Sequence, residues 1–254
     1  IIMNMEDIFS VKNKVVIITG AGKGIGSILA DEFLKRSAIV YAIDKSFPKS
    51  DPKKKYFKKK CDITNKIQLE KICKNISKNE KKIDVLINNA GITIPNNSSK
   101  EYSLEDWKKT LDVNLTGSFL CSQIIGKIMK KQRSGSIINM TSINAELGFP
   151  NNPAYVASKG GLKMLTKSLA KDLGKYGIRV NNLGPGYFVT NMTKKSYENK
   201  KSRMIRQKHT LLDRWGNVSD LIGPCIFLSS NASDYVTGQD LYVDGGWTAN
   251  GLIE

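Results

Sequence analysis

A glycine-rich turn lies between two patterns of different period, and it constrains the fold more than any other feature of the sequence. Residues 14–19 form a β-branched run typical of a buried strand, and the segment Gly20-Ala-Gly-Lys-Gly-Ile-Gly26 follows directly. Residues 27–35 then place their apolar side chains at helical spacing, and residues 38–43 are strand-like again. Strand, turn, helix and strand in this order predict a βαβ unit with two parallel strands.

The same alternation continues along the chain. Five further strands are expected at 56–60, 83–87, 136–140, 178–182 and 241–243, with helices at 66–77, 104–131, 154–175 and 218–229. Alternating strands and helices predict an α/β fold in which helices cover both faces of a mostly parallel sheet. No linker or composition break divides the 254 residues. We therefore expect a single domain spanning 1–254, a Rossmann-like doubly wound sheet of about seven strands.

The charge of the chain is unusual for such a domain. Forty Lys and Arg residues against 23 Asp and Glu give a formal net charge of +17, but the lysines are spread over the whole chain without a nucleic-acid motif. A solvated surface is the preferred interpretation, and an anionic substrate or incidental binding of polyanions is the alternative. We expect no specific nucleic-acid partner.

Cysteine and histidine usage excludes several kinds of site. The four cysteines are widely and irregularly spaced, which is typical neither of a zinc site nor of a disulfide framework. We interpret them as reduced thiols in a cytoplasmic protein. His209 is the only histidine, so a metal centre or a His-based triad is not expected, and no apolar run is long enough to span a membrane.

Two basic runs interrupt the alternation of strands and helices. Residues 53–60 contain six lysines and are expected to form a solvated loop or an edge strand. Residues 190–209 contain seven Lys or Arg and one acid, Glu198, and follow the sixth strand. Long loops inside compact domains are usually functional, so residues 187–210 are predicted to be a substrate lid.

The glycines at 20, 24 and 26 suit a phosphate site. They would allow a tight turn, close approach of a pyrophosphate to the backbone, and an anion at the N-terminus of the following helix. Asp44 ends the second strand, where a carboxylate accepts hydrogen bonds from a ribose and repels a 2′-phosphate, which favours NAD over NADP. The alternatives are a glycine turn without a ligand, an ordinary turn aspartate, and a phosphate tolerated by Lys45.

Tyr155 and Lys159 are four residues apart in the helix predicted at 154–175, so their side chains share one face. A cation beside a phenol favours the phenolate, and we therefore hypothesise that Lys159 lowers the pKa of Tyr155. Each residue also has an ordinary structural interpretation, a half-buried aromatic and a solvated lysine. Ser142 and Asn114 are equally compatible with a helix cap and a turn or helix residue.

Six motifs in one order and spacing resemble the short-chain dehydrogenase/reductase family. They span nearly the whole chain: Thr19 to Gly26, Asn88-Asn-Ala-Gly91, Asn114, Ser142, Tyr155-x-x-x-Lys159 and Pro185-Gly186. The resemblance implies a nicotinamide-cofactor site; together with Asp44 this gives NAD as the expected cofactor, with NADP less favoured, and no metal is expected. The residues that it assigns to the cofactor are Gly20, Lys23, Gly24, Ile25, Gly26, Asp44, Asp62, Ile63, Asn89, Ala90, Gly91, Tyr155, Lys159, Pro185, Gly186 and Thr190.

The resemblance also implies catalytic roles. Tyr155 would transfer the proton, Ser142 would hydrogen-bond the substrate oxygen, Lys159 would contact the nicotinamide ribose, and Asn114 would hold a water. The segments around 213–247 and 114–119 are most similar to gluconate 5-dehydrogenases and related sugar-acid and polyol dehydrogenases. Reductases of 3-oxoacyl carrier proteins share the same residues and are the alternative, and an inactive binding module is a more remote one. Self-association as a homotetramer is expected from the resemblance.

Overall fold

A seven-stranded parallel sheet organises the computed structural model, which describes residues 8–49, 53–96 and 101–251. The strands lie in the order β3-β2-β1-β4-β5-β6-β7, and each neighbouring pair is parallel. Their bounds are β1 Val15–Thr19, β2 Ile39–Asp44, β3 Tyr56–Lys60, β4 Val85–Asn88, β5 Gly135–Met140, β6 Ile178–Pro185 and β7 Asp240–Val243. The predicted fold class and strand number are confirmed.

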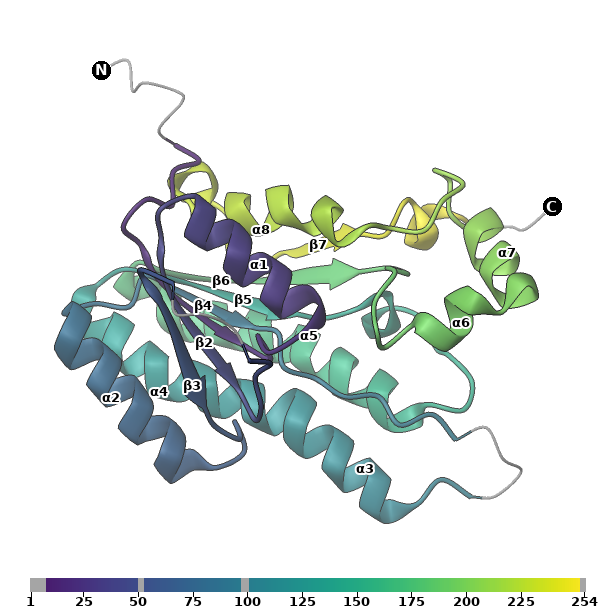
Figure 1. The fold of residues 1–254 in the computed structure, drawn as a ribbon, viewed down its shortest axis with the longest axis horizontal. Coiled ribbons are helices and arrows are strands. Elements are labelled where there is room, and N and C mark those ends of the chain that lie inside the picture. Colours follow the sequence, from purple (N-terminus) through teal and green to yellow (C-terminus); the bar gives the residue numbers. More distant parts are fainter. Residues whose placement is uncertain (1–7, 50–52, 97–100, 252–254) are drawn as a thin grey trace.

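Helices cover both faces of the sheet (Figure 1). Helices α1 (Gly24–Lys35) and α8 (Ile222–Ser229) bury Phe33 and Cys225 against one face. Helices α2 (Lys66–Glu80), α4 (Gly117–Gln132) and α5 (Pro153–Leu173) lie on the other face, where Leu69 and Ile125 are fully buried. Strands β1 and β4 are buried along their whole length because both faces are covered, which explains their continuous apolar runs.

The predicted helix at 104–131 is not continuous. Helix α3 (Leu104–Leu111) and α4 are joined by a π-helical turn, Asp112–Thr116, that contains the buried Asn114. The Asn114 amide bonds both main-chain groups of Ile92, accepting from its N–H at 2.8 Å and donating to its carbonyl at 2.9 Å. A π-turn of this kind is often found at functional sites.

The basic segment at 190–209 is not the loop that its polar composition suggested. It forms two short helices, α6 (Lys194–Glu198) and α7 (Lys200–His209), beyond the carboxyl ends of the strands (Figure 1). The Asn199 side chain caps α7 by accepting a hydrogen bond from the N–H of Ser202. We define the lid segment as residues 187–210; its role as a lid stays a prediction.

Three other differences between the predicted and the observed helices and strands are small. The predicted helix at 218–229 begins with a 3-10 turn, Val218–Leu221, and α5 is followed by a second one, Gly174–Tyr176. Strand β6 extends to Pro185, three residues beyond the prediction. The basic run at 53–60 contributes the edge strand β3, which is one of the two forms expected for it.

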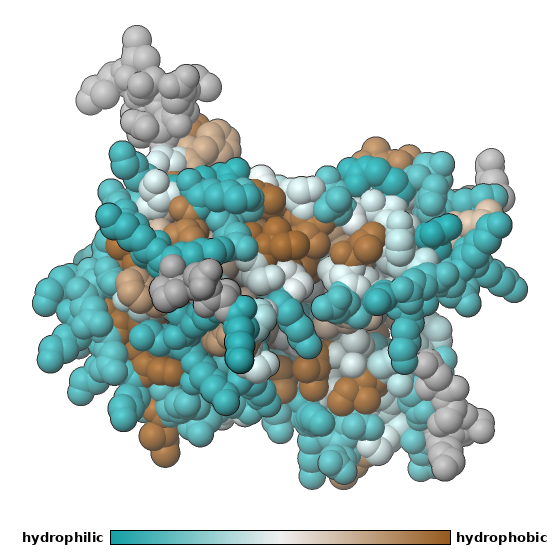
Figure 2. Space-filling model, in the orientation of Figure 1, coloured by the Kyte–Doolittle hydropathy of each residue, from teal (hydrophilic) through white to brown (hydrophobic). Residues whose placement is uncertain are grey.

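The surface is dominated by charged groups. Figure 2 shows hydrophilic residues over most of one face, with smaller hydrophobic areas between them. All four cysteines are buried free thiols. Among the described residues, no helix combines the length and apolarity required to cross a membrane, and no three His, Cys, Asp or Glu side chains gather as a metal site.

Candidate active site

The glycine turn joins β1 to α1 at the carboxyl edge of the sheet. Gly20 has a φ of +65°, and an added Cβ would lie 2.6 Å from Ala90 Cα, so the turn packs directly on the segment after β4. Asn89 fixes the same contact, because its side-chain amide donates to the carbonyls of Thr19 at 2.9 Å and Gly20 at 3.1 Å. Asn89 and Ala90 therefore support the turn.

The space around Gly24 fits a bound phosphate group. Gly24 has a φ of +61°, and an added Cβ would meet nothing within 4 Å. Lys23 occupies the N-cap position of α1 but provides no side-chain cap, so no protein side chain caps this helix N-terminus. Glycine backbone, open space and an uncapped helix N-terminus are the features that a pyrophosphate requires. Gly20, Lys23, Gly24, Ile25 and Gly26 are the residues that would hold it.

Asp44 and Asp62 lie at the ends of the neighbouring strands β2 and β3. Asp44 Oδ2 accepts a hydrogen bond from the N–H of Gly22 at 2.8 Å, which fixes the carboxylate beside the turn. Lys45 turns away from Asp44 and pairs with Asp62 at 2.7 Å. Partial burial raises the pKa of Asp62, but hydrogen bonds from Lys45 and Thr64 outweigh it and hold the pKa below its ordinary value. Ile63 is buried, with its side chain against Gly117.

Tyr155 and Lys159 share one face of α5, as their spacing predicted. The ammonium group of Lys159 lies 5.6 Å from the centre of the Tyr155 ring and donates a hydrogen bond of 2.6 Å to the carbonyl of Met140. Lys159 is only 4% exposed, and burial lowers its pKa to about 8. The lysine thus joins α5 to the end of β5.

Ser142 follows β5 by two residues and faces Tyr155. Burial raises the pKa of the Tyr155 phenol, a hydrogen bond with Ser142 opposes that rise, and the nearby Tyr187 adds to it. This differs from the expectation that Lys159 would lower the pKa, because burial is the largest influence. The Ser142 hydroxyl also caps the short 3-10 turn Ile143–Ala145 by accepting from the N–H of Asn144 at 3.2 Å.

Asn114 and Gly91 complete this cluster. Asn114 donates a hydrogen bond of 3.0 Å to Ser158 Oγ, which lies beside Lys159 in sequence. A methyl group at Gly91 would lie 3.4 Å from Asn114 Oδ1 and 3.7 Å from Lys159 Nζ. Three parts of the chain therefore meet here: Ser142 contacts Tyr155, Lys159 lies beside the Tyr155 ring, and Asn114 is joined to the same helix through Ser158.

Pro185 and Gly186 end β6 at the same edge of the sheet. The N–H of Gly186 donates to the carbonyl of Val243 at 3.0 Å, which ties the segment to β7. Thr190 is engaged with the lid segment, since its N–H donates to Thr193 Oγ1 at 3.1 Å.

The sequence did not identify a group of aromatic residues next to this cluster. The rings of Tyr187 and Trp247 are 4.9 Å apart, Tyr187 and Trp215 are 5.3 Å apart, and His209 lies 4.2 Å from Trp247. Tyr187, Trp215 and Trp247 come from segments more than 20 residues apart, so no local sequence pattern indicates that their rings pack together. The motif segment 213–247 contains Trp215 and Trp247, but nothing in it indicates that their rings meet Tyr187.

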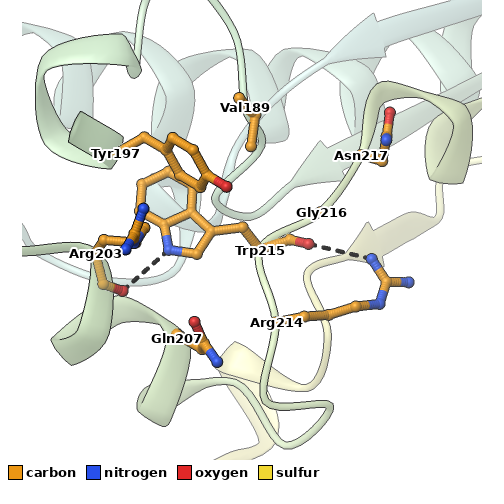
Figure 3. A pocket seen from close by; sticks show the side chains of 8 residues that line it. All are labelled: Val189, Tyr197, Arg203, Gln207, Arg214, Trp215, Gly216 and Asn217. Carbon is orange, nitrogen blue, oxygen red and sulfur yellow. Dashed lines mark hydrogen bonds between the residues drawn. The ribbon is translucent and has the colours of Figure 1, made fainter. Parts of the chain in front are cut away.

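A cavity with a volume of about 370 Å³ lies beside the lid segment. Figure 3 shows its lining, in which Arg203 and Gln207 of α7 face Trp215 and Asn217. None of Asn114, Ser142, Tyr155 and Lys159 lines it. The Trp215 ring stands between this cavity and Tyr187, and its indole N–H donates to the Arg203 carbonyl at 3.1 Å.

Comparisons with known proteins agree with this geometry. A family model described as "Enoyl-(Acyl carrier protein) reductase" matches residues 20–248. The chain is 36% identical over 250 residues to a 5-keto-D-gluconate 5-reductase of Escherichia coli, covering 95% of this chain and 98% of the relative. It is 34% identical over 243 residues to a 3-oxoacyl-(acyl-carrier-protein) reductase of Staphylococcus epidermidis, covering 92% of this chain and 98% of the relative.

A solved structure is also closely similar. A gluconate 5-dehydrogenase from Burkholderia cenocepacia, in complex with NADP and tartrate, superimposes with a TM-score of 0.90 at 32% identity, covering 97% of this chain and 99% of that one. The chain belongs to the short-chain dehydrogenase/reductase family. It is an oxidoreductase that acts on CH–OH groups.

Proposed function

We propose that the protein transfers a hydride between NAD and a secondary alcohol or ketone of a sugar acid. The observation that carries the proposal is the contact between Tyr155 and Ser142, with the Lys159 ammonium 5.6 Å from the Tyr155 ring. A proton-transferring phenol and a second hydroxyl that orients the substrate oxygen are what hydride transfer at a carbinol requires of the protein.

Each residue then has a defined task. A bound nicotinamide supplies the hydride acceptor or donor. Ser142 Oγ donates a hydrogen bond to the substrate oxygen, and Tyr155 Oη takes the proton in oxidation or gives it in reduction. Lys159 Nζ, held by Met140, supplies positive charge beside the phenol, and Asn114 keeps the segment around Ile92 and Ser158 in place.

NAD is the proposed cofactor. Asp44 supports this choice, because its carboxylate is fixed beside the glycine turn and would repel a 2′-phosphate. Lys45 is engaged with Asp62, so the cation that might have accepted that phosphate already has a partner. Gly20 to Gly26, Asp62, Ile63, Asn89 to Gly91, Pro185, Gly186 and Thr190 are the proposed cofactor-binding positions.

A sugar acid is the proposed substrate class for two reasons. The relatives that act on gluconate or ketogluconate match this chain over nearly its full length. The lid segment carries seven basic residues against one acid between 190 and 209, which favours an anionic substrate. The same charge suits an acidic carrier protein, so reduction of a 3-oxoacyl group is the second candidate.

A substrate screen tests the proposal. Sugar acids, polyols and sugar phosphates are incubated with NAD and the absorbance of NADH is followed, alongside reduction of an acetoacetyl thioester by NADH and NADPH. We expect turnover with a sugar acid, lost by at least about 1,000-fold in Tyr155→Phe while NAD still raises the melting temperature. Turnover of the thioester alone would instead support the second candidate.

A further inference from the structure

Helix α7 presents two arginines to two different environments. Arg203 lies over the Tyr197 ring, at 5.3 Å, on the side of the cavity shown in Figure 3. Arg206 lies over the Tyr187 ring, at 4.7 Å, and does not line that cavity. The two side chains are three residues apart on the same short helix. Arg203 can therefore serve as the control in experiments on Arg206.

The guanidinium of Arg206 is only partly used. Its Nη1 donates to the carbonyl of Ser202 at 3.2 Å and to the Ser202 hydroxyl. Its Nε–H is buried and has no hydrogen-bond partner in the described part of the chain. No described carboxylate forms an ion pair with it. A buried donor without a partner destabilises the folded protein, and a ligand that accepts a hydrogen bond from it would remove that penalty.

The unused donors lie on one edge of the guanidinium. Nε and Nη2 are the adjacent pair that binds a carboxylate through two parallel hydrogen bonds, and Ser202 occupies Nη1 only. Because Nε has no contact with solvent, a carboxylate reaches this edge only when the guanidinium turns over the Tyr187 ring. The turn would have to shift the two Nη1 hydrogen bonds to Ser202, but the Nε–Nη2 edge itself has no hydrogen bond to lose among the described residues.

Tyr187 connects this arginine to the reacting groups. It directly follows Pro185-Gly186, and its phenol is close enough to Tyr155 to influence that group electrostatically. None of the other basic side chains of the lid segment lies over the Tyr187 ring. Lys194, Lys195, Lys200, Lys201 and Lys208 are exposed, and Arg203 faces the opposite cavity.

We propose that Arg206 binds the carboxylate of the substrate through its Nε–Nη2 edge and thereby selects a sugar acid over the neutral polyol with the same carbon skeleton. This inference rests on the proposed function and deepens it. Arg206 is a specificity-determining residue in this account and takes no part in proton transfer.

Steady-state kinetics with D-gluconate and D-glucitol provide the first test, on Arg206→Gln, Arg206→Lys and the control Arg203→Gln. Removing a charged double hydrogen bond predicts an increase in KM for gluconate of about 10- to 100-fold in Arg206→Gln, with kcat within about threefold. KM for glucitol should change less than about twofold, and Arg206→Lys should recover part of the loss because it keeps charge without the fork. Arg203→Gln should match the unmodified protein.

Calorimetric binding of tartrate, a dicarboxylate, to the protein with NADH bound, so that no alcohol is oxidised, separates the Arg206 proposal from the proposed function. If gluconate is oxidised and the two arginine variants have the same KM, the role of Arg206 is overturned while the proposed function stands. If no sugar acid is oxidised but tartrate binds at least about tenfold more weakly to Arg206→Gln than to Arg203→Gln, the proposed function fails and the Arg206 site is supported. If no sugar acid is oxidised and the two arginine variants bind tartrate equally well, both the proposed function and the role of Arg206 are overturned. Unchanged NAD affinity in every variant shows that the fold is intact.

Discussion

The ammonium group of Lys159 donates a hydrogen bond of 2.6 Å to the carbonyl of Met140, the last residue of β5. The contact joins the helix that carries Tyr155 to the strand that leads into Ser142. Lys159 is therefore both the cation of the site and a structural link between its two halves. Keeping a buried ammonium there has a cost in stability that should be measurable.

Replacing Lys159 by Met should make the stability of the protein less dependent on pH. Burial lowers the pKa of Lys159 from 10.5 to about 8, so between these values the unfolded chain binds more protons than the folded one. Stability of the unmodified protein therefore rises across this window, and the penalty is full below pH 8. Lys159→Met removes this penalty. Its gain in free energy of unfolding over the unmodified protein should therefore be about 2–3 kcal/mol larger at pH 7 than at pH 10.

Urea denaturation at the two pH values measures this difference, and Lys171→Met on the exposed side of α5 is the control. Lys159→Met should also lose activity with NAD by at least about 100-fold. A pH-independent stability difference would show that Lys159 is not held as a buried cation. An unchanged rate and pH profile would remove it from the proposed mechanism.

Ser142→Ala should shift the pH profile upward. Burial raises the pKa of Tyr155 and the hydrogen bond with Ser142 opposes that rise, so loss of the hydroxyl leaves the phenol protonated to higher pH. Oxidation, which needs phenolate, should then begin at higher pH, and reduction, which needs phenol, should persist to higher pH. Asn144→Ala removes the partner of Ser142 in the 3-10 turn but keeps the hydroxyl, and it should leave the profile in place.

Asp44→Ala should relax the choice of cofactor. The carboxylate is fixed by Gly22 and repels a 2′-phosphate, so its removal should raise kcat/KM for NADP relative to NAD by about 10- to 100-fold. Asp31→Ala removes an exposed carboxylate paired with Lys53 and should not change the ratio. Equal efficiency with both cofactors in the unmodified protein would contradict the assignment of Asp44.

Alanine at the two positive-φ glycines of the glycine-rich turn, Gly20 and Gly24, should have different effects. At Gly20 a methyl group would collide with Ala90 Cα, so strain and collision together should lower the free energy of unfolding by about 3 kcal/mol. At Gly24 the space is open, so only about 1 kcal/mol of backbone strain is expected. Gly24→Ala should nevertheless weaken NAD binding, measured as a smaller rise in melting temperature with NAD. Normal NAD protection in Gly24→Ala would place the pyrophosphate elsewhere.

Local patterns were sufficient to predict the sheet and its main helices. The βαβ pattern around Gly20 to Gly26 gave the first two strands and the turn, and the four-residue spacing placed Tyr155 and Lys159 on one face of α5. These features depend on neighbours in sequence. The π-turn at Asp112–Thr116 does not, because it accompanies the hydrogen bonds between Asn114 and Ile92, 22 residues away.

The two helices of the lid segment could not be predicted from the sequence, because they too depend on contacts with distant residues. Its composition is highly polar, but α7 is stabilised by its Asn199 cap and by contacts with Trp215 and Tyr187, which come from other segments. The different environments of Arg203 and Arg206 follow from those contacts alone. The pKa of Tyr155 likewise depends on burial by the whole fold, which raises it and is the largest influence.

Isotope transfer tests the central claim most directly. Gluconate deuterated at its secondary carbons is incubated with the protein and NAD, and the reduced cofactor is analysed by mass spectrometry. The account predicts that deuterium appears in the nicotinamide ring of NADH, and that Tyr155→Phe, which still binds NAD, transfers at least about 1,000-fold less. Reduced cofactor without deuterium, or equal transfer by Tyr155→Phe, would contradict hydride transfer from a secondary alcohol with Tyr155 as the proton acceptor.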